Sequence, residues 1–167
     1  TNGCLYAREK HISLLNAGVG ALTISLDGLE DTHNWLRNSQ NSFLKVDRAI
    51  NLAASSSRLN FDIVTCVNRR NISELPSIYD YLKNKGVKAW RLFTITPIGR
   101  AKTNRDLFLT DSQFKELLDF ISHNRKRKSI DIKFSCEGYV GQYELRVRDS
   151  FFFCRAGINI GSVLIDG

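Results

Sequence analysis

The sequence of 167 residues contains no methionine, no charged-then-apolar secretory leader and no hydrophobic run close to the roughly 18–20 residues of a membrane-spanning helix. It also stops at Asp166-Gly167, immediately after the apolar run Val163-Leu164-Ile165, although natural termini are usually polar and loosely held. From these absences we expect an interior part of a longer protein, one that resides in the cytoplasm and has no membrane partner.

The chain has only four cysteines, which are Cys4, Cys66, Cys136 and Cys154. They are too few for a disulfide scaffold in a domain of this size, and a reducing compartment is the natural expectation. No CxxC or CxxxCxxC pattern is present, so the sequence encodes no complete metal site. Cys66 falls in the middle of a predicted strand, where we expect a small core residue.

Basic residues are in excess, with 24 Lys and Arg against 17 Asp and Glu and a net charge of +7. This excess keeps open one alternative function, a non-catalytic α/β module that binds nucleic acid or another polyanion. Nucleic-acid-binding domains gather Lys and Arg on one face, whereas here only residues 125–128 form a cluster. That cluster falls at a predicted helix end, where it complements the helix dipole, and a nucleic-acid partner is therefore disfavoured.

Hydrophobic periodicity predicts repeated βα units. Runs rich in β-branched and apolar residues predict strands at 21–26, 61–67 and 90–95, and an alternating run predicts another at 130–134. Apolar residues at helical spacing predict helices at 5–17, 43–53, 72–85 and 110–128. Asn71 and Thr110 have the character of N-caps, each with Glu or Gln three residues later. The expected fold class is α/β with a parallel sheet, whose nearly continuous apolar strands indicate burial on both faces.

Polar residues and glycines follow the predicted strands. Ser25, Asp27 and Gly28 close the first strand, with His33 and Arg37 further on, while Asn68 to Asn71 and Thr96 to Gly99 follow the next two. Ligands bind at the carboxyl ends of strands in parallel α/β folds, so the candidate site lies there. Taken alone, Asp27-Gly28 can equally be a turn, His33 a satisfied histidine and Asn71 a helix cap.

Several strings in this order and spacing carry a family resemblance. They are Thr1-Asn2-Gly3 (itself like the carboxyl end of a strand), Ile24-Ser25-Leu26-Asp27-Gly28, His33 with Leu36-Arg37, Val67-Asn68 with Asn71, and Trp90-Arg91-Leu92-Phe93 with Pro97-Ile98-Gly99-Arg100-Ala101. Together they resemble radical S-adenosylmethionine (SAM) enzymes, specifically the branch with a C-terminal SPASM-type extension. Anaerobic sulfatase-maturating and peptide-modifying enzymes belong to that branch.

The resemblance implies a partial (β/α)6 TIM-like barrel, of which this chain would form the C-terminal part. The family's CxxxCxxC loop and its Gly-Gly-Glu motif would lie upstream of Thr1, so the chain would keep the second half of the SAM pocket. Ser25 and Arg37 match the positions that bind the SAM ribose and carboxylate. Asp27 lies close enough to join them, and Thr96 falls where the backbone flanks the adenine.

The implied activity is that of an Fe–S oxidoreductase or maturase. It would reductively cleave SAM to a 5′-deoxyadenosyl radical and abstract hydrogen from a peptide or protein substrate. A [4Fe-4S] cluster and an electron donor such as flavodoxin or ferredoxin would take part. The 167-residue chain alone is expected to bind no cofactor and to be inactive.

The C-terminal residues carry a second part of the resemblance, Cys154-Arg155-Ala156-Gly157 followed by Asp166-Gly167. Cys154 would be the first ligand of an auxiliary cluster, and Gly167 would precede the next cysteine. The alternative is that Cys154 is a lone buried thiol. On this reading residues 1–135 belong to the partial barrel, and residues 136–167 form a connection and the start of the SPASM-type extension.

Overall fold

A four-stranded parallel sheet organises the computed structural model, which describes residues 1–135, 137–159, 161 and 163. The strands are β1 (Ala21–Ser25), β2 (Asn60–Val67), β3 (Ala89–Thr94) and β4 (Asp131–Phe134), and they lie in that order. The predicted α/β class and parallel sheet are confirmed, and all four strands begin and end within one residue of the prediction. This arrangement is consistent with part of a (β/α)6 barrel.

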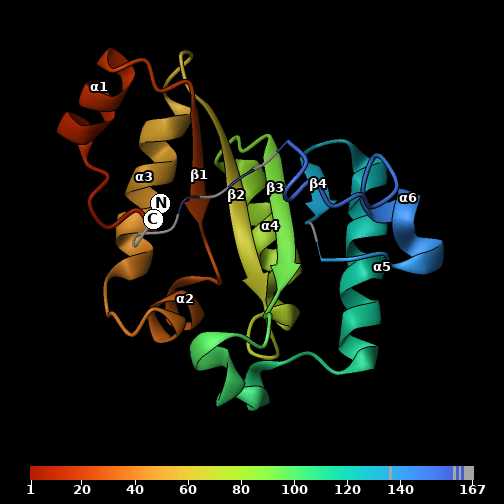
Figure 1. Ribbon diagram of the computed structural model, residues 1–167. Coiled ribbons are helices and arrows are strands. Elements are labelled where there is room, and N and C mark those ends of the chain that lie inside the picture. Colours follow the sequence, from red (N-terminus) through yellow and green to blue (C-terminus); the bar gives the residue numbers. More distant parts are fainter. Residues whose placement is uncertain (136, 160, 162, 164–167) are drawn as a thin grey trace.

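Helices alternate with the strands (Figure 1). The helices are α1 (Arg8–Asn16), α2 (Glu30–Leu36), α3 (Ser42–Ala54), α4 (Leu75–Asn84), α5 (Asp111–Arg127) and α6 (Glu144–Val147). Short 3₁₀ turns are η1 (Ile72–Glu74), η2 (Gly99–Lys102), η3 (Arg105–Leu107) and η4 (Gly141–Tyr143). Among the described residues, none of these helices has the length and apolar character needed to cross a membrane.

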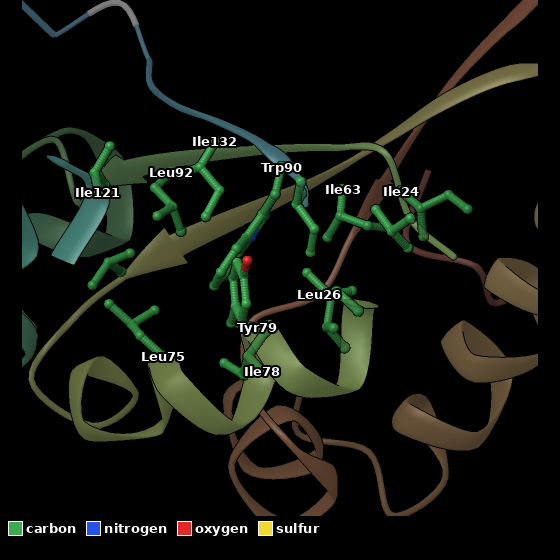
Figure 2. Close-up of a cluster of buried hydrophobic side chains, with 14 of the residues drawn as sticks. Ile24, Leu26, Ile63, Leu75, Ile78, Tyr79, Trp90, Leu92, Ile121 and Ile132 are labelled. Carbon is green, nitrogen blue, oxygen red and sulfur yellow. The ribbon is translucent and has the colours of Figure 1, made fainter. Parts of the chain in front are cut away.

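The hydrophobic core lies between one face of the sheet and helices α3, α4 and α5. Figure 2 shows Ile63, Trp90 and Leu92 of the strands above Ile78 and Tyr79 of α4, all of them buried. The apolar stripes predicted for α3, α4 and α5 supply most of the helix side of this core. Burial of each large aliphatic or aromatic side chain contributes about 1.5–3 kcal/mol, so the core fixes the sheet against the helices.

Two helix boundaries follow the predicted local chemistry. At the start of α5 the Thr110 side chain accepts from the Gln113 N–H while the Gln113 side chain accepts from the Thr110 N–H, which is the predicted capping box. At the end of α4 the chain turns through Gly86, whose φ of +73° is readily available to glycine. These features are local in sequence, which is why the pattern predicted them.

Two segments differ from the expected pattern. Helix α2 was not predicted, because its buried residues are the polar Thr32 and His33 rather than an apolar stripe. Beyond β4 the expected irregular or hairpin-like chain includes α6, which packs on α5. The division into residues 1–135 and 136–167 stays a prediction.

The sheet face turned away from α3, α4 and α5 keeps its side chains half-buried or exposed. Thr23 and Ser25 of β1 and Arg91 of β3 lie on this face, as does Lys133 of β4. The expectation that the strands are buried on both faces is therefore wrong, because the helices of the described part of the chain cover only one of them. We call the other face the helix-free face.

Thr1 continues the sheet at the outer edge of β1. Its amino group donates to the Thr23 carbonyl at 2.7 Å, and its carbonyl accepts from the Ser25 N–H at 2.9 Å. These two bonds follow the pattern between neighbouring parallel strands, and they agree with the strand-end interpretation of Thr1-Asn2-Gly3. Gly3 then passes close to α3, where a Cβ would lie 3.1 Å from the Val46 Cα.

Candidate functional site

A pocket of about 430 Å³ opens on the helix-free face at the carboxyl ends of β1, β2 and β3. Its polar lining residues are Ser25, Asp27, Arg37, Cys66 and Asn68. Its apolar lining residues are Leu36, Val64, Phe93 and Ile95. Its volume lies in the range of about 300–1,000 Å³ typical of small-molecule sites. Three of the four predicted cofactor-binding residues thus meet in one cavity, although their role toward a cofactor stays a prediction.

Asp27 holds Arg37 at the wall of this pocket. One carboxylate oxygen of Asp27 pairs with Nη2 of Arg37, and the other accepts from the Cys66 N–H at 2.9 Å. The Arg37 Nε is buried and has no hydrogen-bond partner in the described structure. The Arg37 side chain is nevertheless 32% exposed, and in the described structure only its Nη2 is paired, so N–H donors remain for a second acceptor and the residues present fit a ligand carboxylate.

His33 fixes the turn from which Asp27 projects. The Asp27 N–H donates to His33 Nδ1 at 3.1 Å, so Nε2 carries the imidazole proton and donates to Ser42 Oγ at 3.2 Å. The pKa of His33 is lowered to about 4, chiefly by burial, with the Asp27 charge opposing the shift and the Arg37 charge adding to it. The imidazole is therefore neutral, and His33 is a satisfied buried histidine.

Gly28 is required for the close approach of α2 to this turn. A Cβ at Gly28 would lie 2.8 Å from Cβ of Thr32. Any larger residue would push α2 outward, and the side chains of Leu36 and Arg37 would move with the end of that helix. The Asp27-Gly28 pair thus forms a turn, and Asp27 also lines the pocket.

Asn71 ties the ends of two strands together instead of capping a helix. Its amide group donates to the carbonyls of Asp27 at 2.8 Å and Cys66 at 2.9 Å, and its oxygen accepts from the Asn68 N–H at 2.8 Å. The predicted N-cap role is wrong, because the side chain makes no cap hydrogen bond to η1 or α4. These long-range bonds set the spacing of the strand ends on which the pocket is built.

Thr96, the fourth predicted cofactor-binding residue, lies outside the pocket. It is exposed two residues beyond β3, whereas its neighbour Ile95 lines the pocket. Cys66 was expected in the core, yet it faces the pocket, since alternation along β2 places residues 62, 64, 66 and 68 on the helix-free face. That alternation was the sequence signal for Val64, Cys66 and Asn68. Burial raises the pKa of the Cys66 thiol to about 12, so it remains protonated.

Cys154 is exposed and free of any disulfide, which disagrees with the alternative of a buried thiol. Its predicted companion Gly167 lies outside the described residues, as does Cys136. Among the residues that the structure describes, no three His, Cys, Asp or Glu side chains gather to hold a metal ion. A ligand role for Cys154 therefore stays a prediction.

Comparison with known proteins shows that the sequence of this chain is similar to those of several enzymes. The AdoMet-dependent heme synthase of Oleidesulfovibrio alaskensis is 29% identical over 136 residues, and that of Nitratidesulfovibrio vulgaris is 28% identical over 136 residues. The Fe-coproporphyrin III synthase of Methanosarcina barkeri is 26% identical over 129 residues. The chain is similar to AdoMet-dependent enzymes. AdoMet is SAM, so these relatives agree with the radical SAM resemblance.

The likeness has definite limits. The matches to the two AdoMet-dependent heme synthases cover 81% of this chain but only 35% and 37% of those proteins, so the chain spans about a third of their length. No protein-family model matches the chain. None of the relatives' names refers to a peptide substrate or to a SPASM-type extension.

Proposed function

We propose that this chain forms the second half of the SAM-binding pocket of a radical SAM enzyme. The observation that carries the proposal is the convergence of Ser25, Asp27 and Arg37 in one pocket, with an unsatisfied N–H on Arg37. The similarity to AdoMet-dependent enzymes over 81% of the chain supports it.

In this proposal Arg37 binds the SAM carboxylate through charge-assisted hydrogen bonds, and Asp27 holds the guanidinium in place. Ser25 offers a hydroxyl to the ribose, and Leu36 and Ile95 provide an apolar surface for the adenine. When bound and reduced by a [4Fe-4S] cluster, SAM supplies the radical chemistry that removes a hydrogen atom from a substrate. The chain has no CxxxCxxC motif, so the thiolates for that cluster must come from other residues of the complete protein.

For the substrate of the complete protein, we propose a haem-type tetrapyrrole. The resemblance alone implied a peptide or protein, but the names of the relatives are heme synthase and Fe-coproporphyrin III synthase. A flavodoxin- or ferredoxin-like electron donor and a SPASM-type extension that begins at Cys154 remain parts of the proposal.

The alternative of a polyanion-binding module has less support. In the basic cluster at the end of α5, Arg125 donates to the Ile132 carbonyl and pairs with Asp149. The Arg127 guanidinium lies over the Tyr79 ring, 4.9 Å from its centroid. Half of the cluster therefore supports the fold rather than presenting free charge to a partner.

Calorimetric titration of SAM onto the complete protein tests the proposed site. Arg37→Ala should weaken binding by about 1.5–3 kcal/mol, because a charge-assisted interaction is lost. Ser25→Ala should cost about 0.5–1.5 kcal/mol, since one neutral hydrogen bond is lost. Arg8→Ala on exposed α1 removes the same charge away from the pocket and is the control. Unchanged SAM affinity in both pocket variants would mean that the site is assigned wrongly.

A further inference from the structure

A single row of side chains crosses the helix-free face from the candidate SAM site to the far edge of the sheet. The strand register pairs Ser25 with Val64, Val64 with Arg91, and Arg91 with Lys133. Neighbouring strands lie about 4.8 Å apart, so the Lys133 backbone is about 14 Å from that of Ser25. Arg91 and Lys133 therefore lie on the same face as the proposed SAM site, and the strand spacing fixes their distance from Ser25.

Arg91 is held in place but keeps donors available. Its Nε pairs with Asp62 and its Nη2 donates to Thr23 Oγ1 at 3.0 Å. Nη1 has no acceptor within the described part of the chain, and the side chain is 45% exposed. Because guanidinium has five N–H donors, a further acceptor can bind without breaking either contact.

Lys133 is held in a similar way at the sheet edge. Its Nζ lies 2.9 Å from an Asp131 oxygen and 2.7 Å from an Asp149 oxygen, and the side chain is 35% exposed. An ammonium has three N–H donors, so these two contacts leave one. Arg91 and Lys133 are register partners, and their free donors can therefore reach the same or neighbouring acceptors.

The surface between the SAM site and these cations is apolar. Val64 follows Ser25 in the row, and Phe93 lies two residues beyond Arg91 on the same face. Both side chains also line the candidate pocket. A ligand that bridges the two regions would thus rest on an aliphatic and aromatic floor and reach the free N–H donors of Arg91 and Lys133 at its far end.

We propose that Arg91 and Lys133 bind carboxylate groups of the substrate, whose flat apolar body lies over Val64 and Phe93. This inference rests on the proposed function and deepens it, because it assigns residues that recognise the acidic side chains of a tetrapyrrole. Carboxylates match the free N–H donors of both cations, because hydrogen bonds between charged groups are stronger than those that a neutral acceptor would form. The pairs with Asp62, Asp131 and Asp149 position the cations.

The test uses the complete protein and two probes, metal-free coproporphyrin III, whose side chains include carboxylates, and its methyl ester, in which they are neutral. Fluorescence titration gives the dissociation constant of each probe, and calorimetry gives that of SAM. The wild-type protein should bind the acid at least about tenfold more tightly than the ester. Arg91→Gln with Lys133→Gln should abolish this preference and leave the affinities for the ester and for SAM unchanged.

Lys115→Gln is the matched control, since Lys115 forms an exposed ion pair with Asp119 on α5, outside the helix-free face. Arg91→Lys keeps the charge and should retain part of the preference, and Lys133→Gln alone serves if the double variant does not fold. Equal binding of acid and ester by the wild type, or an undiminished preference in the variants, overturns the inference. Loss of SAM binding by the wild type would instead overturn the proposed function, so the two failures are distinguishable.

Discussion

His33 is the residue whose environment differs most from that of an ordinary histidine. It is 1% exposed, and both ring nitrogens are hydrogen-bonded within the turn that carries Asp27. Protonation would place a proton on Nδ1, where the Asp27 N–H already points, and would bury a charge. The geometry of the pocket wall thus depends on a neutral imidazole.

This dependence predicts a specific loss of stability in acid. The folded-state pKa of His33 is about 4 against an ordinary value of 6.5, so the unfolded chain binds more protons between those pH values. Stability from His33 is therefore complete above about pH 6.5 and falls as the pH drops toward 4. Between pH 6.5 and 4.5 we expect a loss of about 2–3 kcal/mol in the wild type that His33→Gln does not show.

Urea unfolding at several pH values measures this difference, with His123→Gln on the exposed side of α5 as the control. The control should keep the wild-type pH dependence. Parallel stability curves for wild type and His33→Gln would show that His33 titrates normally in the folded protein.

At the scale of elements, a feature can be predicted from the sequence when the interactions that form it are local, and not when they are long-range. The α5 capping box and the buried stripe Leu75, Ile78, Tyr79 and Leu82 of α4 are local patterns, and the sequence predicted both. Helix α2 depends on a partner 45 residues away, because Glu74 accepts from the Leu29 N–H at 2.9 Å and from the Thr32 hydroxyl. Glu74 was expected to cap its own helix, and no local pattern reveals this longer-range contact.

The candidate site shows the same difference between features that the sequence predicts and long-range contacts that it does not. Ser25, Asp27 and Arg37 were found from strand-end position and family resemblance. The Asp27–Arg37 pair and the Asn71 bonds could not be predicted, because they depend on how β1, β2 and α2 meet in space. Sequence identifies the polar residues of such a site better than the contacts between them.

Asn71 allows a test of this long-range bonding. Asn71→Ala removes three side-chain hydrogen bonds from a fully buried position, and should lower the free energy of unfolding by about 2–4 kcal/mol. Thr110→Ala, which removes only the local cap of α5, should cost about 1 kcal/mol. Urea midpoints provide both values. An Asn71→Ala loss no larger than that of Thr110→Ala would contradict the clamp between strand ends.

For the whole molecule, one face of the sheet packs against helices and the other carries the candidate binding site. Helices α3, α4 and α5 bury the core on one face, which supplies the stability. The helix-free face then presents the candidate pocket, the apolar floor and the paired cations in register. Because Ser25, Val64, Arg91 and Lys133 project from strands rather than from long loops, their spacing is fixed by backbone hydrogen bonds.

Beyond this sheet, Cys154 offers a test of the proposed auxiliary cluster in the complete protein. An exposed thiol with no disulfide partner is available as a thiolate ligand, and the following Gly157 has a φ of +74°, which allows a tight turn. Cys154→Ala should lower the iron content by about one [4Fe-4S] cluster while SAM binding persists. Cys4→Ala and Cys66→Ala are matched controls that should leave iron unchanged. Anaerobic iron and sulfide analysis measures the effect, and full iron content in Cys154→Ala would assign Cys154 no role as a ligand.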